Sequence, residues 1–302
     1  MTLGLTMHIP LLFRALLFVL TGICLQAQTI PPHTRTEDVV YGRKFGVALT
    51  LDVIQPEKPN GYAIVYMVSG GWISAYSPNT PIFYAPFLER GYTVFSVRHG
   101  CQPKFTIPEI TQDVLRAVRF IRHNARKWNI DPDRLGVSGG SAGGHLSLTI
   151  GVQGSPGQAD SRDPIDRESS AIQAIACLYP PTDFLNYGKP GEVAVGVGTL
   201  EKYKPAFGSE ADTPEGRQRL GKAVSPIYHV TSKFPPTLII HGDRDLLVPI
   251  QQAETFVTRV KAAGAIAKLV VKPGANHGWT DRQPDYTLFA DWFDEHLRGL
   301  KK

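Results

Sequence analysis

Cysteine is scarce in this chain, with three among 302 residues, so a scaffold built on disulfides is excluded. The chain also has little excess of charge of either sign. It contains 32 Lys and Arg and 27 Asp and Glu, for a formal net charge of +5. So small an excess gives no support for a nucleic-acid partner. Hydrophobic residues make up 42% and charged residues 20% of the chain, which is a globular composition rather than a disordered or fibrous one.

The amino terminus lacks an apolar run of membrane-spanning length. The stretch from Leu11 to Leu25 is shorter than the about 20 residues that a spanning helix needs, and Arg14 interrupts it. A helix of the core is the alternative, but no periodicity separates a polar face from an apolar one. An apolar stretch followed by Gln26 and Ala27 is typical of a secretory signal peptide. We therefore predict a signal peptide over residues 1–27, a secreted or periplasmic protein, and no stable membrane anchor.

The rest of the chain alternates predicted strands with predicted helices. Val39 to Ile54 predicts an antiparallel hairpin that turns between Gly42 and Gly46. Short apolar runs of the buried parallel type follow at residues 63–68, 92–97, 135–138, 172–178, 237–240 and 268–271. Amphipathic helices are predicted over residues 108–127, 251–263 and 286–297. This α/β order indicates one domain over residues 37–300, a mostly parallel sheet with helices on both faces.

In such a sheet, sites form at the carboxyl ends of the strands, and a G-x-S-x-G motif lies at one of them. Gly139 to Gly143 follows a predicted strand and precedes a predicted helix. The turn is so sharp that side chains at Gly139 and Gly143 would clash, and it lifts Ser141 to the sheet edge as a candidate nucleophile. A glycine-rich phosphate-binding turn is the alternative, but no Walker lysine follows.

A serine nucleophile needs a base and an orienting carboxylate. Among nine histidines, His277 lies between glycines in a loop after the last predicted strand, whereas His145, one turn beyond Ser141, is expected to be structural. Asp243 and Asp245 both follow an earlier strand, and their spacing does not choose between them. The order Ser, Asp, His along the chain is that of an α/β-hydrolase triad.

With these motifs the sequence resembles the α/β-hydrolase superfamily, in its esterase/lipase branch. The strings GGSAGGHLSL, HGDRDLLVP, GANHGW and VSGGWIS carry the resemblance, which extends from Val39 to Leu300. The branch includes acetyl-xylan and feruloyl-type carbohydrate esterases and is related to prolyl oligopeptidase catalytic domains. The resemblance implies the α/β-hydrolase fold and a catalytic triad of Ser141, Asp245 and His277.

The loop that supplies the oxyanion hole departs from this family. Lipase-like relatives carry His-Gly-Gly-Gly-Trp, whereas this chain has Val68 and Ser69 in place of the first two residues. The backbone amides of Gly70, Gly71 and Ala142 are the expected oxyanion donors.

We therefore expect a secreted serine hydrolase that cleaves carboxylic esters, with acetyl or feruloyl esters of carbohydrates as candidate substrates. A serine peptidase or aminoacyl hydrolase of the prolyl oligopeptidase type is one alternative, and a non-catalytic, hydrolase-like binding scaffold is another. The expected partner is a small-molecule or oligosaccharide ester. No cofactor is expected, and the sequence does not indicate an oligomeric state.

Three further features are interpreted as structural. Asp160, Asp163 and Asp166 recur at every third position, but the interspersed Arg162 and Arg167 favour an ion-paired surface loop over a metal site, so no metal is expected. Arg116 is expected on a solvated helix face. Cys101 and Cys177 belong to strands that should not be neighbours, so two separate thiols are expected.

Overall fold

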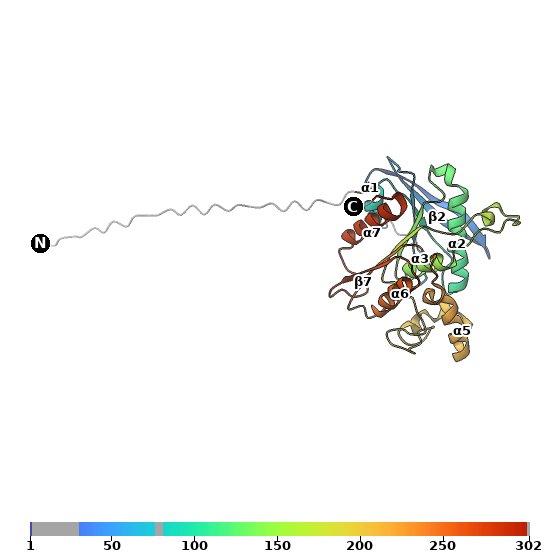
Figure 1. The fold of residues 1–302 in the computed structure, drawn as a ribbon, viewed down its shortest axis with the longest axis vertical. Helices are drawn as coiled ribbons and strands as arrows, with labels where there is room; N and C mark the ends of the chain where they lie inside the picture. The colour runs from blue at the N-terminus through green and yellow to red at the C-terminus, as the bar shows by residue number, and fades with distance from the viewer. Residues whose placement is uncertain (2–29, 76–80, 301–302) are drawn as a thin grey trace.

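A computed structural model describes residues 1, 30–75 and 81–300 of the chain (Figure 1). The predicted signal peptide, with its cleavage site near Ala27, lies outside the described residues apart from Met1. No helix in the described ranges has the length and apolar character that crossing a membrane requires.

Eight strands form one sheet in the order β1-β2-β4-β3-β5-β6-β7-β8. The pairs β1–β2 and β2–β4 are antiparallel, and all other pairs are parallel. The strands are β1 (His33–Lys44), β2 (Val47–Pro56), β3 (Ala63–Met67), β4 (Thr93–Val97), β5 (Leu135–Gly140), β6 (Ala174–Leu178), β7 (Thr237–Gly242) and β8 (Ala267–Lys272). The predicted amino-terminal hairpin and the mostly parallel sheet are confirmed.

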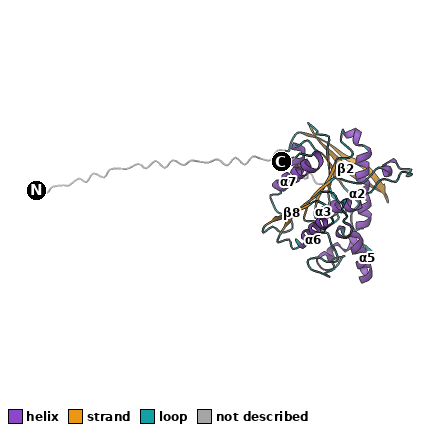
Figure 2. Cartoon of the chain, viewed as in Figure 1, coloured by secondary structure: helices purple, strands orange, loops and turns teal. Residues whose placement is uncertain are grey.

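Helices cover both faces of the sheet (Figure 2). Helices α1 (Pro81–Glu89) and α7 (Gln283–Arg298) pack on one face, around Phe87, Phe289 and Phe293. Helices α2 (Ile107–His123), α3 (Ala142–Gln153) and α6 (Gln251–Ala262) pack on the other. Shorter helices complete the chain: η1 (Ala125–Trp128), η2 (Pro164–Arg167), η3 (Gly198–Tyr203), α4 (Lys204–Phe207), η4 (Ser209–Asp212), α5 (Pro214–Val224) and η5 (Pro226–His229). The α/β fold class predicted from the alternation of strands and helices is confirmed.

Two element boundaries differ from the prediction for local reasons. Strand β1 continues to Lys44, so the hairpin turns at Phe45 and Gly46, both of which adopt positive φ. The predicted helix over residues 108–127 is interrupted at Asn124, whose side-chain amide donates to the carbonyl of Phe120 at 2.8 Å. That hydrogen bond ends α2 and allows η1 to begin.

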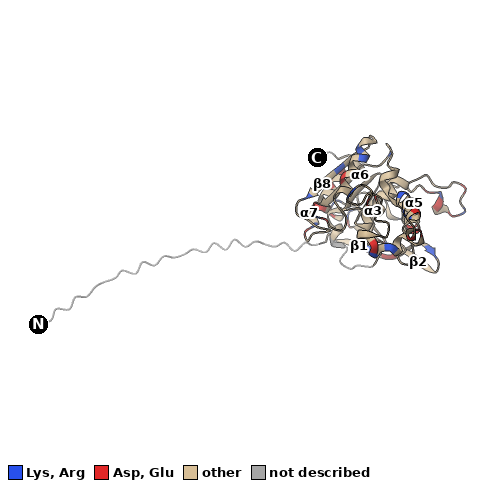
Figure 3. Ribbon diagram, turned by 90° about the horizontal axis from the view of Figure 1, so that it is seen from below, with Lys and Arg blue, Asp and Glu red and all other residues tan. Residues whose placement is uncertain are grey.

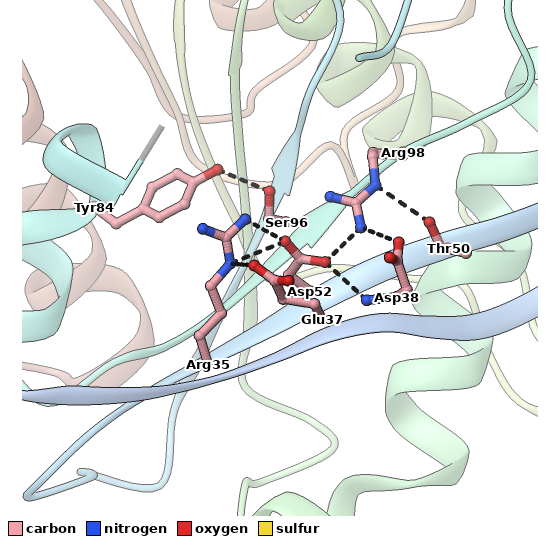
Figure 4. Close-up of polar contacts among 8 residues, drawn as sticks. All are labelled: Arg35, Glu37, Asp38, Thr50, Asp52, Tyr84, Ser96 and Arg98. Carbon is pink, nitrogen blue, oxygen red and sulfur yellow. Dashed lines mark hydrogen bonds and ion pairs between the residues drawn. The ribbon is translucent and has the colours of Figure 1, made fainter. Parts of the chain in front are cut away.

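A buried ion-pair network joins the antiparallel edge of the sheet to its parallel part. Asp52 on β2 is fully buried, and Arg35 on β1 and Arg98 after β4 approach its carboxylate from two sides (Figure 4). The Asp38 N–H adds a hydrogen bond of 3.1 Å. Burial by itself raises the pKa of Asp52, but the hydrogen bonds from Arg98 and Arg35 outweigh it and hold that pKa below its usual value. The carboxylate therefore stays ionised and fastens β1 and β2 to β4.

The acidic loop around η2 is ion-paired, although not by the partners that the sequence suggested. Arg116 from α2 donates to Asp163 at 2.7 Å and to Asp166 at 2.9 Å. Arg116 was expected on a solvated face and Arg162 and Arg167 were expected to pair with the loop; instead, α2 packs against the loop and brings its own arginine to it. Among the described residues there is no group of three side chains able to hold a metal ion.

The described part of the chain has no segregation of charge along its ribbon and no disulfide between its two cysteines. Basic and acidic positions are interspersed along the described ribbon when it is seen from below (Figure 3). Cys177 lies buried in β6, and Cys101 follows β4, with β3 and β5 between these strands. Both thiols are free, as the strand order predicted.

Candidate active site

The turn between β5 and α3 holds Ser141 in a conformation that few side chains adopt. Its φ is 54° and its ψ is −122°, and its N–H donates to the Leu178 carbonyl at 3.0 Å. A Cβ atom at Gly139 would lie 2.6 Å from the carbonyl oxygen of Gly143, and one at Gly143 would lie 2.5 Å from that of Met67. Because both obstacles are backbone atoms, these two positions require glycine for the serine to be presented at the sheet edge.

This steric requirement predicts a difference between adjacent glycines. Gly139→Ala is expected to lower the free energy of unfolding by about 2 kcal/mol, because the turn must shift to admit the methyl group. Gly140→Ala is the matched control, since a Cβ there would meet its nearest atoms at 3.5 Å, an ordinary contact. Urea unfolding of both variants measures the difference, and equal stabilities would contradict this account of the turn.

The side chains of Ser141, His277 and Asp245 form a continuous chain of hydrogen bonds. Ser141 Oγ lies 2.9 Å from His277 Nε2, and His277 Nδ1 lies 2.8 Å from Asp245 Oδ2. A carboxylate only accepts, so Nδ1 carries the proton and Nε2 is left to accept from the serine hydroxyl. The three predicted residues thus come together, in the order that proton transfer from the serine requires.

Of the two candidate acids, Asp245 is the one that contacts His277. Its other oxygen, Oδ1, accepts from the N–H groups of Leu247 at 2.9 Å and Val248 at 2.8 Å. Burial raises the pKa of Asp245, but hydrogen bonds from His241, His277 and Val248 N–H lower it more, so its net pKa lies well below the usual value. The carboxylate is therefore ionised wherever the protein is folded under ordinary conditions.

Asp243 instead connects the loop after β7 to the loop that carries His277. Its Oδ1 accepts from Gly274 N–H at 2.6 Å. Asn276 adds a second connection, because its Oδ1 accepts from Leu246 N–H at 3.1 Å and from His277 N–H at 2.7 Å. These contacts hold the base and the acid in register, a role that sequence reasoning did not assign to Asn276.

His241 is a further residue that the sequence analysis missed. It ends β7 fully buried, with Nε2 2.8 Å from the Val248 carbonyl and 3.3 Å from Asp245 Oδ2. It therefore approaches the same carboxylate oxygen that His277 Nδ1 contacts. The histidine that opens the string HGDRDLLVP was the available signal.

His145 supports the oxyanion loop and not the proton transfer. It is fully buried, accepts from Trp72 Nε1 at 3.3 Å and donates from Nε2 to the Val224 carbonyl at 2.8 Å. Burial lowers the pKa of His145 to about 4, despite the opposing effect of the Val224 hydrogen bond. The imidazole is thus neutral and structural, as its position one turn after Ser141 suggested.

The backbone amides expected at the oxyanion hole differ in their hydrogen bonds. Gly70 N–H already donates to the Ile73 carbonyl at 3.0 Å. Within the described residues, Gly71 N–H has no acceptor, and Ala142 N–H belongs to the first residue of α3, where helix amides are unpaired. Gly71 has a φ of 55° and lies against Tyr203, so a Cβ there would come within 2.4 Å of the tyrosine ring.

Ser141 opens on a pocket of about 460 Å³ and on a separate cavity of about 10 Å³. Both are lined by Gly71, Ser141, Tyr203 and Leu247. The larger pocket is also lined by His277, Tyr179 and Arg282, and the smaller cavity is also lined by Trp72, Tyr187, Leu200 and Val248. The segment over residues 187–227 thus contributes Tyr187, Leu200 and Tyr203 to the walls of the site.

Comparison with known families gives this geometry its context. The sequence pattern of the BD-FAE family matches residues 51–260, more than half of the chain. The chain belongs to the BD-FAE family. This BD-FAE chain carries the fold and motifs of the esterase branch of the α/β-hydrolases, so the resemblance stated from its motifs is confirmed.

Several named relatives of the BD-FAE chain are esterases. It is 29% identical to the esterase LipQ of Mycobacterium tuberculosis over 258 residues, 82% of this chain and 59% of LipQ. A truncated carbohydrate esterase from gut microbiota is 26% identical, with a TM-score of 0.74 over 87% of this chain and 95% of the other. Esterase 2 of Thermogutta terrifontis, solved phosphonylated by sarin, is 25% identical, with a TM-score of 0.70 over 88% and 95%. The chain spans about half the length of the curated relatives it matches.

Proposed function

We propose that the protein hydrolyses carboxylic esters through an acyl-enzyme formed on Ser141. The observation that carries the proposal is the chain of hydrogen bonds from Ser141 Oγ through His277 to the buried Asp245, at 2.9 and 2.8 Å. A hydroxyl becomes nucleophilic when a base within hydrogen-bond distance takes its proton, and the base needs a carboxylate to fix its tautomer.

In the first half of the reaction, His277 Nε2 removes the proton from Ser141 Oγ as that oxygen bonds to the ester carbonyl carbon. The carbonyl oxygen becomes an oxyanion, and we assign its donors to Gly71 N–H and Ala142 N–H, because Gly70 N–H is engaged by Ile73. The intermediate collapses when His277 passes the proton to the leaving alcohol. Asp245 stabilises the imidazolium that exists between these two proton transfers.

In the second half, water replaces the alcohol. His277 removes a proton from the water, whose oxygen bonds to the acyl carbon, and the same amides hold the second oxyanion. The proton then returns to Ser141 Oγ and the carboxylic acid leaves. Both halves use the same three side chains, because His277 acts as the base and then as the acid in each of them.

We further propose that the acyl group is acetyl and not feruloyl. The cavity beneath Ser141 and Ala142 has about 10 Å³, close to the smallest volume that holds one water molecule. A methyl group is of that size, whereas a feruloyl group is not. The alcohol part of the ester then occupies the pocket of about 460 Å³.

The acyl preference is tested with p-nitrophenyl esters. We expect kcat/KM for the acetate to exceed that for the hexanoate by at least about tenfold, and Leu200→Ala to reduce this ratio because it enlarges the cavity. Leu220→Ala is the matched control, since Leu220 is similarly buried, 4% against 2% exposed, but lies in α5 and does not line the cavity. A ratio that both variants change equally would contradict the assignment of this cavity to the acyl group.

Chromogenic amides linked to proline separate esterase from peptidase activity. A peptidase of the prolyl oligopeptidase type would release the chromophore from these amides, whereas an esterase would not. That release would replace the proposed esterase activity by a peptidase activity that uses the same triad.

We also propose that the protein acts after export, in the periplasm or outside the cell. The support is the apolar stretch before Ala27. Extracellular acetylated polysaccharides then become accessible substrates.

A further inference from the structure

Arg282 brings an unbalanced positive charge to the larger pocket. It lies just before α7 and is half-buried, and its guanidinium stacks on the ring of Phe83 with Cζ 4.7 Å from the ring centroid. Nη1 donates to Tyr179 Oη at 3.0 Å, whereas Nε is buried and has no acceptor within the described residues. A guanidinium that is held this way, with an aromatic ring on one face, has lost part of its hydration without gaining a counter-ion.

The acidic side chains near Arg282 in the sequence are engaged elsewhere. Asp285 accepts from Lys272 Nζ at 2.9 Å and from Trp279 Nε1 at 2.6 Å. Asp281 accepts from Gln283 N–H at 3.2 Å. In the described ranges no carboxylate oxygen lies within 4.0 Å of the Arg282 guanidinium, and every Asp and Glu of the chain falls within those ranges.

The pocket itself supplies no negative charge either. Its walls come from glycine, serine, apolar and aromatic residues together with His277 and Arg282, and they contain no aspartate or glutamate. Arg282 does not line the small cavity assigned to the acyl group, so its charge faces the part of the site left for the alcohol.

We propose that Arg282 binds a carboxylate on the alcohol part of the ester, so that the substrate class is acetyl esters of carboxylate-bearing alcohols such as sugar acids. This inference rests on the proposed esterase function. A carboxylate would supply the missing counter-ion and complete the hydrogen bonding of a partly desolvated guanidinium, which is the setting in which such pairs are strongest.

The test compares substrates that differ in charge alone at one position. The 3- and 4-acetoxybenzoates are anionic, and the corresponding acetoxybenzamides are neutral esters of similar shape. We expect Arg282→Gln to lower kcat/KM for the acetoxybenzoates by about 10- to 100-fold, mainly through KM, and for the acetoxybenzamides by less than about threefold. Arg282→Lys should retain part of the preference for the anion.

Two controls separate recognition from structural support. Tyr179→Phe removes the Tyr179–Arg282 hydrogen bond but keeps the charge, so the ratio of anionic to neutral turnover should persist. Arg259→Gln removes one positive charge from the exposed face of α6, which should leave both substrates unaffected.

The outcomes distinguish failure of the carboxylate site from failure of the proposed esterase function. If Arg282→Gln slows both substrate classes equally, or neither, the carboxylate site is wrong. The same holds if wild type hydrolyses p-nitrophenyl acetate but not the acetoxybenzoates. If wild type hydrolyses no ester at all, the proposed function itself fails.

Discussion

Ser141→Ala is expected to lower kcat/KM for p-nitrophenyl acetate by about 10⁵-fold or more. Without Oγ there is no atom to carry the acyl group, and His277 loses the partner 2.9 Å from its Nε2. The residual rate would come from water bound near His277 and from the oxyanion donors. Initial rates of p-nitrophenol release, corrected for spontaneous hydrolysis, measure the loss.

Ser138→Ala is the matched control for this variant. Ser138 lies on β5, the strand that leads into the turn at Ser141; it is fully buried, and its Oγ has no hydrogen-bond partner among the described residues. Removal of the Ser138 hydroxyl should leave the rate within about twofold of wild type, because no hydrogen bond among the described residues is lost with it. Covalent labelling by a fluorophosphonate should occur in wild type and Ser138→Ala but not in Ser141→Ala. Equal turnover in all three proteins would remove Ser141 from the mechanism, whereas absence of labelling in folded wild type would favour the non-catalytic scaffold.

Asp245→Asn is expected to lower kcat by about 10⁴-fold without unfolding the protein. Oδ1 accepts from the Leu247 and Val248 N–H groups, so the asparagine oxygen takes that place and its NH₂ group faces His277. Nδ1 of His277 must then accept, which moves the proton to Nε2 and leaves no lone pair for the Ser141 hydroxyl. The amide also cannot stabilise the imidazolium.

Asp243→Asn separates this effect from a general disturbance of the loops. Its Oδ1 accepts from Gly274 N–H, a bond that the asparagine oxygen preserves. We expect this variant to lose no more than about tenfold, since only the strength of one charge-assisted hydrogen bond changes. Comparable losses for Asp243→Asn and Asp245→Asn in steady-state kinetics would show that the acid has been assigned to the wrong residue.

The turn that carries Ser141 could be predicted from the sequence, because backbone atoms exclude any side chain at two of its positions. Gly139 and Gly143 face backbone carbonyls within 2.6 Å of any Cβ, so the motif and the geometry determine each other. The buried strands were readable for a similar reason, since parallel strands covered on both faces must be apolar throughout. Their full order in the sheet was not predicted, because no local pattern determines which strands pair.

Other features depend on contacts between distant segments and left no local signal. Helix α1 was not predicted, because Pro86 in its interior disfavours a helix locally; burial of Tyr84, Phe87 and Leu88 against the sheet outweighs that cost. Spacing could not separate Asp243 from Asp245, because both follow the same strand and only the loop after β8 decides which one meets His277. Arg282 was not singled out from the sequence, because only the packing of its guanidinium on Phe83, just before α7, places it in the pocket.

The hydrogen bond between Ser141 and His277 joins residues 136 positions apart in the chain. Ser141 leaves β5 and His277 follows β8, and β6 and β7 lie between these strands in the sheet. The two residues approach each other only after three successive parallel pairings have formed, each at the entropic cost of closing a long loop. The hydrogen bond that activates Ser141 is therefore a property of the completed sheet and not of any one segment of the chain.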